Sequence, residues 1–308
     1  LIILMLLTAL GETSTQLLIP ALGELERGLE AEPGSSLLAL SLFVGAFGLG
    51  QLLLDGSEVK LQRAAAANLP GSRQTAYFSG RGAPALQKLA VNADAVIGLR
   101  SVWADDPLYP MARRSNIRIV EVDAARPVDG SLPGIAVQPG APKDGLNSQP
   151  WLSSNNLGRM ADVTAADLVR LAPAAKPKIE ANLATLKQQL LKLSADSEAR
   201  LGDIDNLSVV SLSERFGYLI GGLNLEQVAY EVPAEEQWTP EALAQLTALL
   251  KDNDVALVLD HRQPSEAVAA AVAKAGSHLL VLEGAGEKPL SELQGSIDQV
   301  IKALAGKA

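Results

Sequence analysis

The feature that most constrains this chain is an alternation of short apolar runs with stretches of helical periodicity. Short strand-like runs, rich in apolar residues, occupy positions 95–99, 117–122, 207–212 and 255–259, with helical patterns between them. Runs of this length suit strands that are buried on both faces, and helical segments supply the crossovers that parallel strands require. The chain is therefore predicted to be an α/β protein whose sheets are mostly parallel.

A second pattern divides these α/β units into two sets. From residue 156 to residue 202, apolar side chains recur at helical spacing, while Pro173 and Pro177 are expected to bend or break the pattern. This segment is predicted to be one long kinked helix or two helices in line. The predicted domains are a hydrophobic N-terminal segment (1–36), an N-terminal α/β lobe (37–155), a linking helix (156–202) and a C-terminal α/β lobe (203–308).

The composition excludes several classes of function. The 308 residues include no cysteine and only two histidines, so thiolate metal sites, iron–sulfur clusters and a site of three histidines from one chain are excluded. The formal charge of −9 argues against nucleic acid or an anionic membrane surface as the main partner. No P-loop or G-x-S-x-G motif occurs, and neither a nucleotide site nor a catalytic triad is predicted.

The first 54 residues allow three interpretations. Residues 33–54 form an uncharged run of 22 residues, long enough to cross a bilayer core of roughly 30 Å. The opening run LIILMLLTAL is also compatible with a secretory signal or an anchor. In the third interpretation residues 37–44 are a buried strand, 45–54 a short helix and 58–62 the next strand, as at the start of an α/β domain.

This front end carries a resemblance of its own. The stretches LMLLTALGETSTQLLIPALGEL and LLALSLFVGAFGLGQLLL resemble the first two membrane helices of major-facilitator drug-efflux transporters of the bicyclomycin-resistance type. The resemblance ends at Leu54, and no further run of membrane length follows. A working facilitator is therefore not expected, and a fusion of two origins stays open.

Three later stretches resemble the solute-binding proteins of metal-type ABC transporters, the cluster that includes zinc and manganese binders. They are QPWLSSNN ahead of the long helical segment, SLSERFGYLIGGLNLEQV, and TPEALAQLTALLKDNDVALVLDHRQPSEAVAAAVAKAGSHLLVLE. The resemblance covers about residues 55–305. It implies two Rossmann-like lobes joined by a rigid backbone helix, a ligand held between the lobes, and a binding protein rather than an enzyme.

The resemblance also implies a set of ligand residues. Three histidines and one carboxylate are usual in the family, and by position they correspond to Thr75, Gln149, Ser213 and Asp260. Only the carboxylate is retained. The candidate ligand-binding residues, with two neighbours added, are Thr75, Gln149, Ser213, Glu214, Asp260 and His261, of which Asp260 and His261 are the candidate metal ligands.

These replacements predict a change in ligand chemistry. Glutamine and serine oxygens are neutral and bind Zn²⁺ weakly, so one carboxylate and one imidazole do not complete a tetrahedral site. The expected ligand is a divalent metal (Zn²⁺ or Mn²⁺) or an iron chelate, and a chelate would be held by hydrogen bonds and a few charges. Arg81, Arg215 and Arg262 are the candidate positive charges.

Plainer interpretations of the same residues stay open. Gln149 is equally compatible with a loop position ahead of a helix that Asn155 or Asn156 caps. Trp151 suits a core position better than a ligand platform, because it precedes a helix that must dock on a lobe. His261 is a ligand candidate or a partly exposed polar neighbour of Asp260.

The predicted function is that of a solute-binding protein of an ABC importer, in the periplasm or on the extracytoplasmic face, either free or tethered through the N-terminus. Its predicted partners are the membrane permease of the importer and a metal or metal-chelate ligand. The main alternative is a membrane-anchored interaction or scaffold protein that uses the same fold without a transport ligand. An α/β enzyme is a third option, since fold does not fix function.

Overall fold

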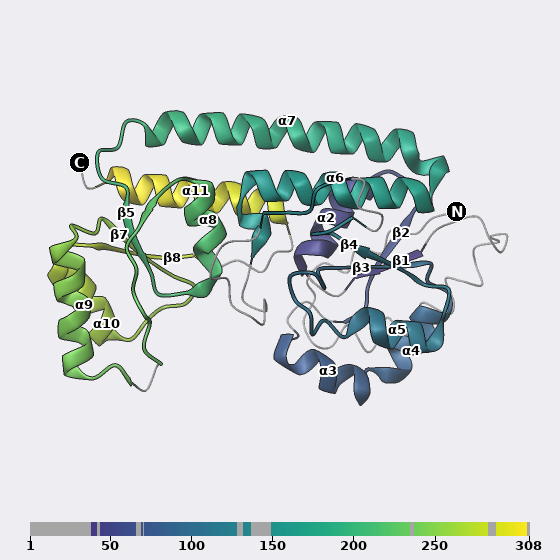
Figure 1. The fold of residues 1–308 in the computed structure, drawn as a ribbon, viewed down its shortest axis with the longest axis horizontal. Coiled ribbons are helices and arrows are strands. Elements are labelled where there is room, and N and C mark those ends of the chain that lie inside the picture. Colours follow the sequence, from purple (N-terminus) through teal and green to yellow (C-terminus); the bar gives the residue numbers. More distant parts are fainter. Residues whose placement is uncertain are drawn as a thin grey trace. The chain divides into compact units, whose positions relative to one another are not determined.

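The computed structural model describes residues 38–41, 44–65, 69, 71–127, 132–136, 149–234, 237–282 and 288–306. They form two compact units. The first contains the described residues up to 134 together with 160–185, and the second contains the described residues of 135–159 and those from 186 onward. A parallel sheet with helices around it lies in each unit (Figure 1), which confirms the predicted α/β class with two lobes.

The first unit is built around a sheet of four parallel strands in the order β2-β1-β3-β4. Its strands are β1 (Leu38–Ser41), β2 (Lys60–Arg63), β3 (Ala95–Gly98) and β4 (Val120–Asp123). Its helices are α2 (Val44–Leu54), α3 (Gly71–Ser79), α4 (Ala83–Val91) and α5 (Leu108–Ser115). Figure 1 shows α3, α4 and α5 together on one side of this sheet.

The central strand β3 shows how the first sheet is covered on both faces. Val96 packs in a core with side chains of α3, α4 and α5, such as Phe78 and Leu108. The next residue, Ile97, faces α2, where a Cβ on Gly50 would lie 3.4 Å from the Ile97 Cδ1 atom. Successive side chains of a strand point to opposite faces, so helices bury both faces and all four residues of β3 are buried.

The second unit repeats the arrangement with the strand order β6-β5-β7-β8, again parallel throughout. Its strands are β5 (Ser208–Ser211), β6 (Glu226–Gln227), β7 (Leu257–Asp260) and β8 (His278–Val281). Its helices are the 3₁₀ turns η1 (Pro150–Leu152) and η3 (Glu214–Phe216), α8 (Gly217–Gly222), α9 (Pro240–Asp252), α10 (Glu266–Ala275) and α11 (Pro289–Ala305). Val210 and Val258 pack against α9 and α10, which cover one face.

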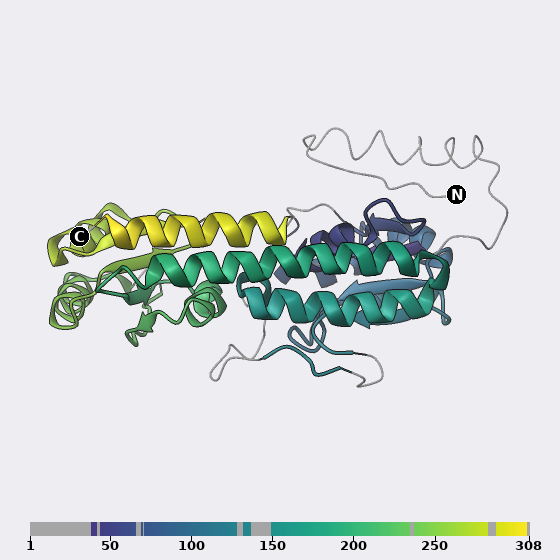
Figure 2. The ribbon, with the colours of Figure 1, turned by 90° about the horizontal axis from the view of Figure 1, so that it is seen from above.

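Two helices contribute residues to both units, and they correct one expectation. The predicted linking segment consists of α6 (Ser154–Leu171), a 3₁₀ turn η2 (Pro173–Ala175) and α7 (Lys176–Leu201). The helices are not in line: the chain reverses at η2, and α6 and α7 lie side by side in both views (Figures 1 and 2). Gly158 of α6 lies against Leu190 of α7, since a Cβ added to Gly158 would be 3.6 Å from the Leu190 Cδ1 atom. This contact shows that the two helices pack against each other. Pro173 ends the helix because proline cannot donate the hydrogen bond that would continue it, whereas Pro177 lies in the first turn of α7, where proline is tolerated.

The front end of the described chain agrees with the strand-and-helix interpretation for residues 38–54. β1 pairs with β2 and β3 in the first sheet, and α2 follows it. Within the described ranges, none of the helices has both the length and the apolar character that a membrane crossing demands. Residues 1–36, predicted to be a signal or an anchor, lie outside the described residues.

Candidate ligand site

The strand order of the second sheet marks a crevice at one of its edges. After β5 the chain places β6 on one side, and it then places β7 on the other side. Open α/β sheets bind ligands where the order reverses in this way, outside the carboxyl ends of the strands. Ser213 lies two residues beyond the end of β5, and Asp260 is the last residue of β7. Two of the predicted ligand residues therefore lie at this switch point.

Asp260 is the most constrained polar residue at this edge. Its side chain is buried, and its Oδ1 atom accepts hydrogen bonds from the backbone N–H groups of His261, at 2.7 Å, and Arg262, at 3.4 Å. The His261 Nδ1 atom lies 3.3 Å from the same oxygen, but without hydrogen-bond geometry. Asp260 thus holds the turn after β7 and places His261, whose side chain is partly exposed, beside its own carboxylate.

Two arginines add positive charge beside this pair. Burial lowers the pKa of Arg215, and the nearby guanidinium of Arg262 lowers it further. Burial also lowers the pKa of His261; Arg215 and Arg262 act in the same direction, and Asp260 opposes them. His261 is therefore mainly neutral at pH 7. Two guanidiniums, of Arg215 and Arg262, and one carboxylate, of Asp260, therefore act on this imidazole.

Ser213 has a structural task at the switch point. Its backbone N–H donates to the Ser211 hydroxyl at 3.3 Å, and its own hydroxyl accepts from the Arg215 N–H at 3.3 Å. Ser213 therefore caps η3, as serine commonly does at the start of a helical turn, and fixes the segment that carries Arg215. Glu214, the other candidate here, is exposed.

Gln149 lies at a different hollow of the second unit. A small cavity of about 10 Å³, partly open to solvent, is lined by residues that include Gln149, Arg215 and Glu292. Arg215 is thus shared between this cavity and the surroundings of His261. The expected place of Trp151 in the core is confirmed, since it is 3% exposed in η1.

The helix after Gln149 does not start as predicted. α6 begins at Ser154, and the Ser153 hydroxyl lies 3.5 Å from the Asn156 N–H that it faces, so Ser153 stands in the capping position. Asn156 is already inside the helix, and its side chain is buried. Its Oδ1 atom accepts a hydrogen bond from the Ala136 N–H at 3.2 Å, and its Nδ2 atom donates one to the Ala136 carbonyl at 3.1 Å. The prediction of Asn155 or Asn156 as the cap was wrong, because serine one turn earlier takes that place.

Thr75 lies in the first unit, and its position does not favour a ligand role within that unit. It is exposed on α3, whereas its neighbour Gln74 is 6% exposed and has an Oε1 atom that accepts no hydrogen bond from the described residues. Arg81, also exposed, stacks over the ring of Tyr77 at 5.3 Å. Gln74 was missed because its burial depends on the rotation of a short helix, which the sequence pattern does not define.

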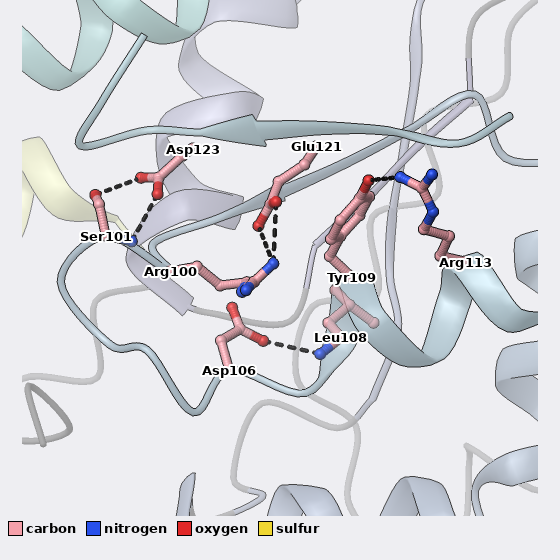
Figure 3. Close-up of polar contacts among 8 residues, drawn as sticks. All are labelled: Arg100, Ser101, Asp106, Leu108, Tyr109, Arg113, Glu121 and Asp123. Carbon is pink, nitrogen blue, oxygen red and sulfur yellow. Dashed lines mark hydrogen bonds and ion pairs between the residues drawn. The ribbon is translucent and has the colours of Figure 1, made fainter. Parts of the chain in front are cut away.

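A second polar cluster lies at the carboxyl edge of the first sheet (Figure 3). Arg100, two residues beyond β3, donates through one nitrogen to both carboxylate oxygens of Glu121, at 3.2 and 3.1 Å. Asp123, the last residue of β4, accepts from the N–H and the hydroxyl of Ser101, at 2.6 and 3.0 Å. These contacts tie the ends of β3 and β4 together.

Asp106 completes this cluster. The sequence Asp-Asp-Pro at 105–107 is an ordinary turn signal, yet Asp106 is 2% exposed and its Oδ1 atom accepts from the Leu108 N–H at 2.9 Å (Figure 3). Burial raises the pKa of Asp106, and burial also raises the pKa of Glu121 although Arg100 opposes it. The cluster supports the sheet edge, and the acidic residues at the strand ends were the only signal for it in the sequence.

Asp260 and His261 are the two predicted metal ligands that lie next to each other at the switch point. Across the part of the chain that the structure describes, no three histidine, aspartate or glutamate side chains come together in a group that could hold a metal ion. The arrangement can instead hold an anionic or polar ligand through guanidinium and amide groups.

Several solved structures share this fold. An FpvC mutant from Pseudomonas aeruginosa superposes with a TM-score of 0.70 at 20% identity, covering 87% of this chain and 99% of that one. FpvC from the same organism in complex with Ni²⁺ gives a TM-score of 0.66 at 21% identity, with 89% and 98% covered. A ZnuA deletion mutant with zinc bound gives 0.64 at 18%, with 87% and 98% covered.

These identities establish the fold, and a sequence model defines the family. The model of ZnuA, described as the periplasmic component A of the zinc-uptake complex, matches residues 87–305. That range contains the switch-point residues of the second unit, the helices α6 and α7, and β3, α5 and β4 of the first unit. The chain belongs to the ZnuA family of metal-type ABC solute-binding proteins.

Proposed function

We propose that this protein is the extracytoplasmic solute-binding component of an ABC importer and that it captures a metal as an anionic chelate rather than as a bare ion. The ligand contacts Asp260, His261, Arg215 and Arg262 at the carboxyl ends of β5 and β7, and the loaded protein delivers its cargo to a membrane permease. Membership of the ZnuA family supports the transport role.

The observation that carries the proposal is the charge at the switch point. A bare divalent cation is held by carboxylates and neutral imidazoles that together outweigh nearby positive charge. Of the charged groups that act on His261, two are guanidiniums and one is a carboxylate. The guanidiniums repel a dication and attract the carboxylate, hydroxamate or catecholate oxygens of a chelator. The relatives with Ni²⁺ or zinc bound support a metal as the cargo.

The proposal is tested by reversing one of these charges. Arg262→Glu replaces a repulsive guanidinium by a carboxylate beside Asp260 and His261, so a third ligand becomes available to a dication. Titration calorimetry is expected to show Zn²⁺ binding at least about tenfold tighter in this variant than in the wild type. Arg118→Glu is the matched control, because Arg118 is exposed in the first unit and its replacement makes the same charge change.

Two results would count against the proposal. One is wild-type protein that already binds Zn²⁺ at nanomolar concentration, which means that the guanidiniums do not repel the ion. The other is an equal gain in Arg118→Glu, which means that the total charge of the chain, rather than the switch point, controls the affinity.

A further inference from the structure

A second groove of the second unit is lined by Asp260 and by residues other than those of the Gln149 cavity. Its volume is about 70 Å³, and it is partly open to solvent. Its floor is apolar and belongs to the core, with Leu212 and Val268 almost fully buried. Asp260 and Arg262 line the same groove. The groove therefore joins an apolar surface to the polar edge where the ligand is proposed to bind.

The remaining wall comes from the segment between β6 and α9. Val232 is 40% exposed, and Trp238, which lines the same groove, is partly exposed. The Trp238 ring stacks on Tyr230, with centroids 6.4 Å apart and an angle of 24° between the planes. This stacking, together with the packing of both rings on the core below, holds the indole in a fixed orientation before any ligand arrives.

We propose that this groove is a subsite for the aromatic ring of an anionic chelator, such as a catecholate or salicylate group. This inference rests on the proposed function and names the class of chelator. The ring lies against Val232 and Trp238, and the ionised oxygens on its edge pair with the Arg262 guanidinium, while the same oxygens hold the metal.

The shape and the charge of the groove both favour this occupant. A planar ring gains apolar contact and stacking against indole, which a ringless chelator such as citrate does not. Its oxygens are negative, and they meet Arg262 at the rim with Arg215 nearby.

The experiment compares two ferric chelates on one set of variants. The probes are Fe³⁺ with 2,3-dihydroxybenzoate, which carries a ring, and ferric citrate, which is anionic without one. Affinities are measured by titration calorimetry on the wild type, Val232→Ser, Trp238→Leu and Arg262→Gln. Ile117→Ser and Arg118→Gln are the matched controls, since Ile117 is 76% exposed and both residues lie in the first unit.

The expected affinities distinguish contacts with the aromatic ring from attraction between charges. Val232→Ser and Trp238→Leu lower the affinity for the ring-bearing chelate at least about fivefold, or about 1 kcal/mol, and leave ferric citrate unchanged. Arg262→Gln lowers the affinity for both chelates, and neither control changes either one. Trp238→Leu removes core contacts as well, so Val232→Ser, at an exposed position, carries the comparison if Trp238→Leu fails to fold.

Two outcomes would overturn the subsite. If Val232→Ser leaves both affinities unchanged while Arg262→Gln weakens both, there is no ring subsite, yet the proposed capture of an anionic chelate stands. If the wild type binds no ring-bearing chelate at millimolar concentration, the subsite is also refuted. Tight Zn²⁺ binding by the wild type would in addition refute the proposed function.

Discussion

Replacing Asn156 by alanine tests the unexpected role of this residue at the start of α6. Its side chain is 5% exposed and makes two hydrogen bonds to the backbone of Ala136, at 3.2 and 3.1 Å. Losing two neutral hydrogen bonds costs about 2 kcal/mol, since each contributes about 1 kcal/mol net. Alanine regains roughly 0.5 kcal/mol through its higher helix propensity. We therefore expect Asn156→Ala to lower the free energy of unfolding by about 1.5 kcal/mol.

Asn155→Ala provides the control, because Asn155 is the neighbouring asparagine in the same helical turn and is exposed. Its replacement is expected to change the free energy of unfolding by less than about 0.5 kcal/mol. Urea unfolding followed by tryptophan fluorescence measures both variants, with the slope against urea unchanged. A larger loss for Asn155→Ala than for Asn156→Ala would refute the reasoning, because it would return the capping role to Asn155.

Three further predictions concern stability. Asn182→Ala should lower the free energy of unfolding by about 1–2 kcal/mol, because the Asn182 amide donates at 2.9 Å to the carbonyls of Leu53 and Asp55. Gln188→Ala, at an exposed position of the same helix, is the control and should change it little in urea unfolding. Thr239→Ala should lower the free energy of unfolding by about 1 kcal/mol, because Thr239 caps α9 by accepting from the Ala242 N–H; an unchanged urea midpoint would contradict that role. Asp106→Asn should become more stable relative to the wild type as the pH rises. Because burial raises the pKa of Asp106 in the folded state, the wild type loses stability from about pH 4 upward through the folded pKa, and asparagine does not ionise. A stability difference that stays constant between pH 4 and pH 7.5 would contradict the direction given for this pKa.

The sequence predicted the elements well where a strand is buried on both faces. β3, β5 and β7 lie within one or two residues of their apolar runs, since continuous burial leaves a continuous apolar signal. β4 was predicted from residue 117 but begins at Val120, because the Asn116 amide bonds to the carbonyls of Ala90 and Ala93 and holds a turn there. Ile117 is 76% exposed as a result. No local sequence pattern predicts hydrogen bonds such as those of Asn116, because their acceptors lie more than twenty residues away in the chain.

The candidate site could be predicted in part. The end of a strand is visible in sequence, so Asp260 and its neighbours were placed at a sheet edge. The predicted members of the site remain predictions as ligands, and the structure adds that Ser213 caps a turn while Arg215 and Arg262 act on His261. The groove beside Asp260 could not be predicted, because it depends on how the segment before α9 folds back on the core.

Metal content and ligand-dependent melting of the purified protein distinguish capture of an anionic chelate from capture of a bare metal ion. The protein is dialysed, analysed for bound metal, and then melted with Zn²⁺, Mn²⁺ and ferric chelates at equal concentration. Because two guanidiniums and one carboxylate act on His261, we expect no stoichiometric zinc or manganese in the purified protein. We also expect a larger rise in melting temperature with an anionic ferric chelate than with any bare ion. One equivalent of zinc or manganese bound at nanomolar affinity, with no stabilisation by any chelate, would contradict the account.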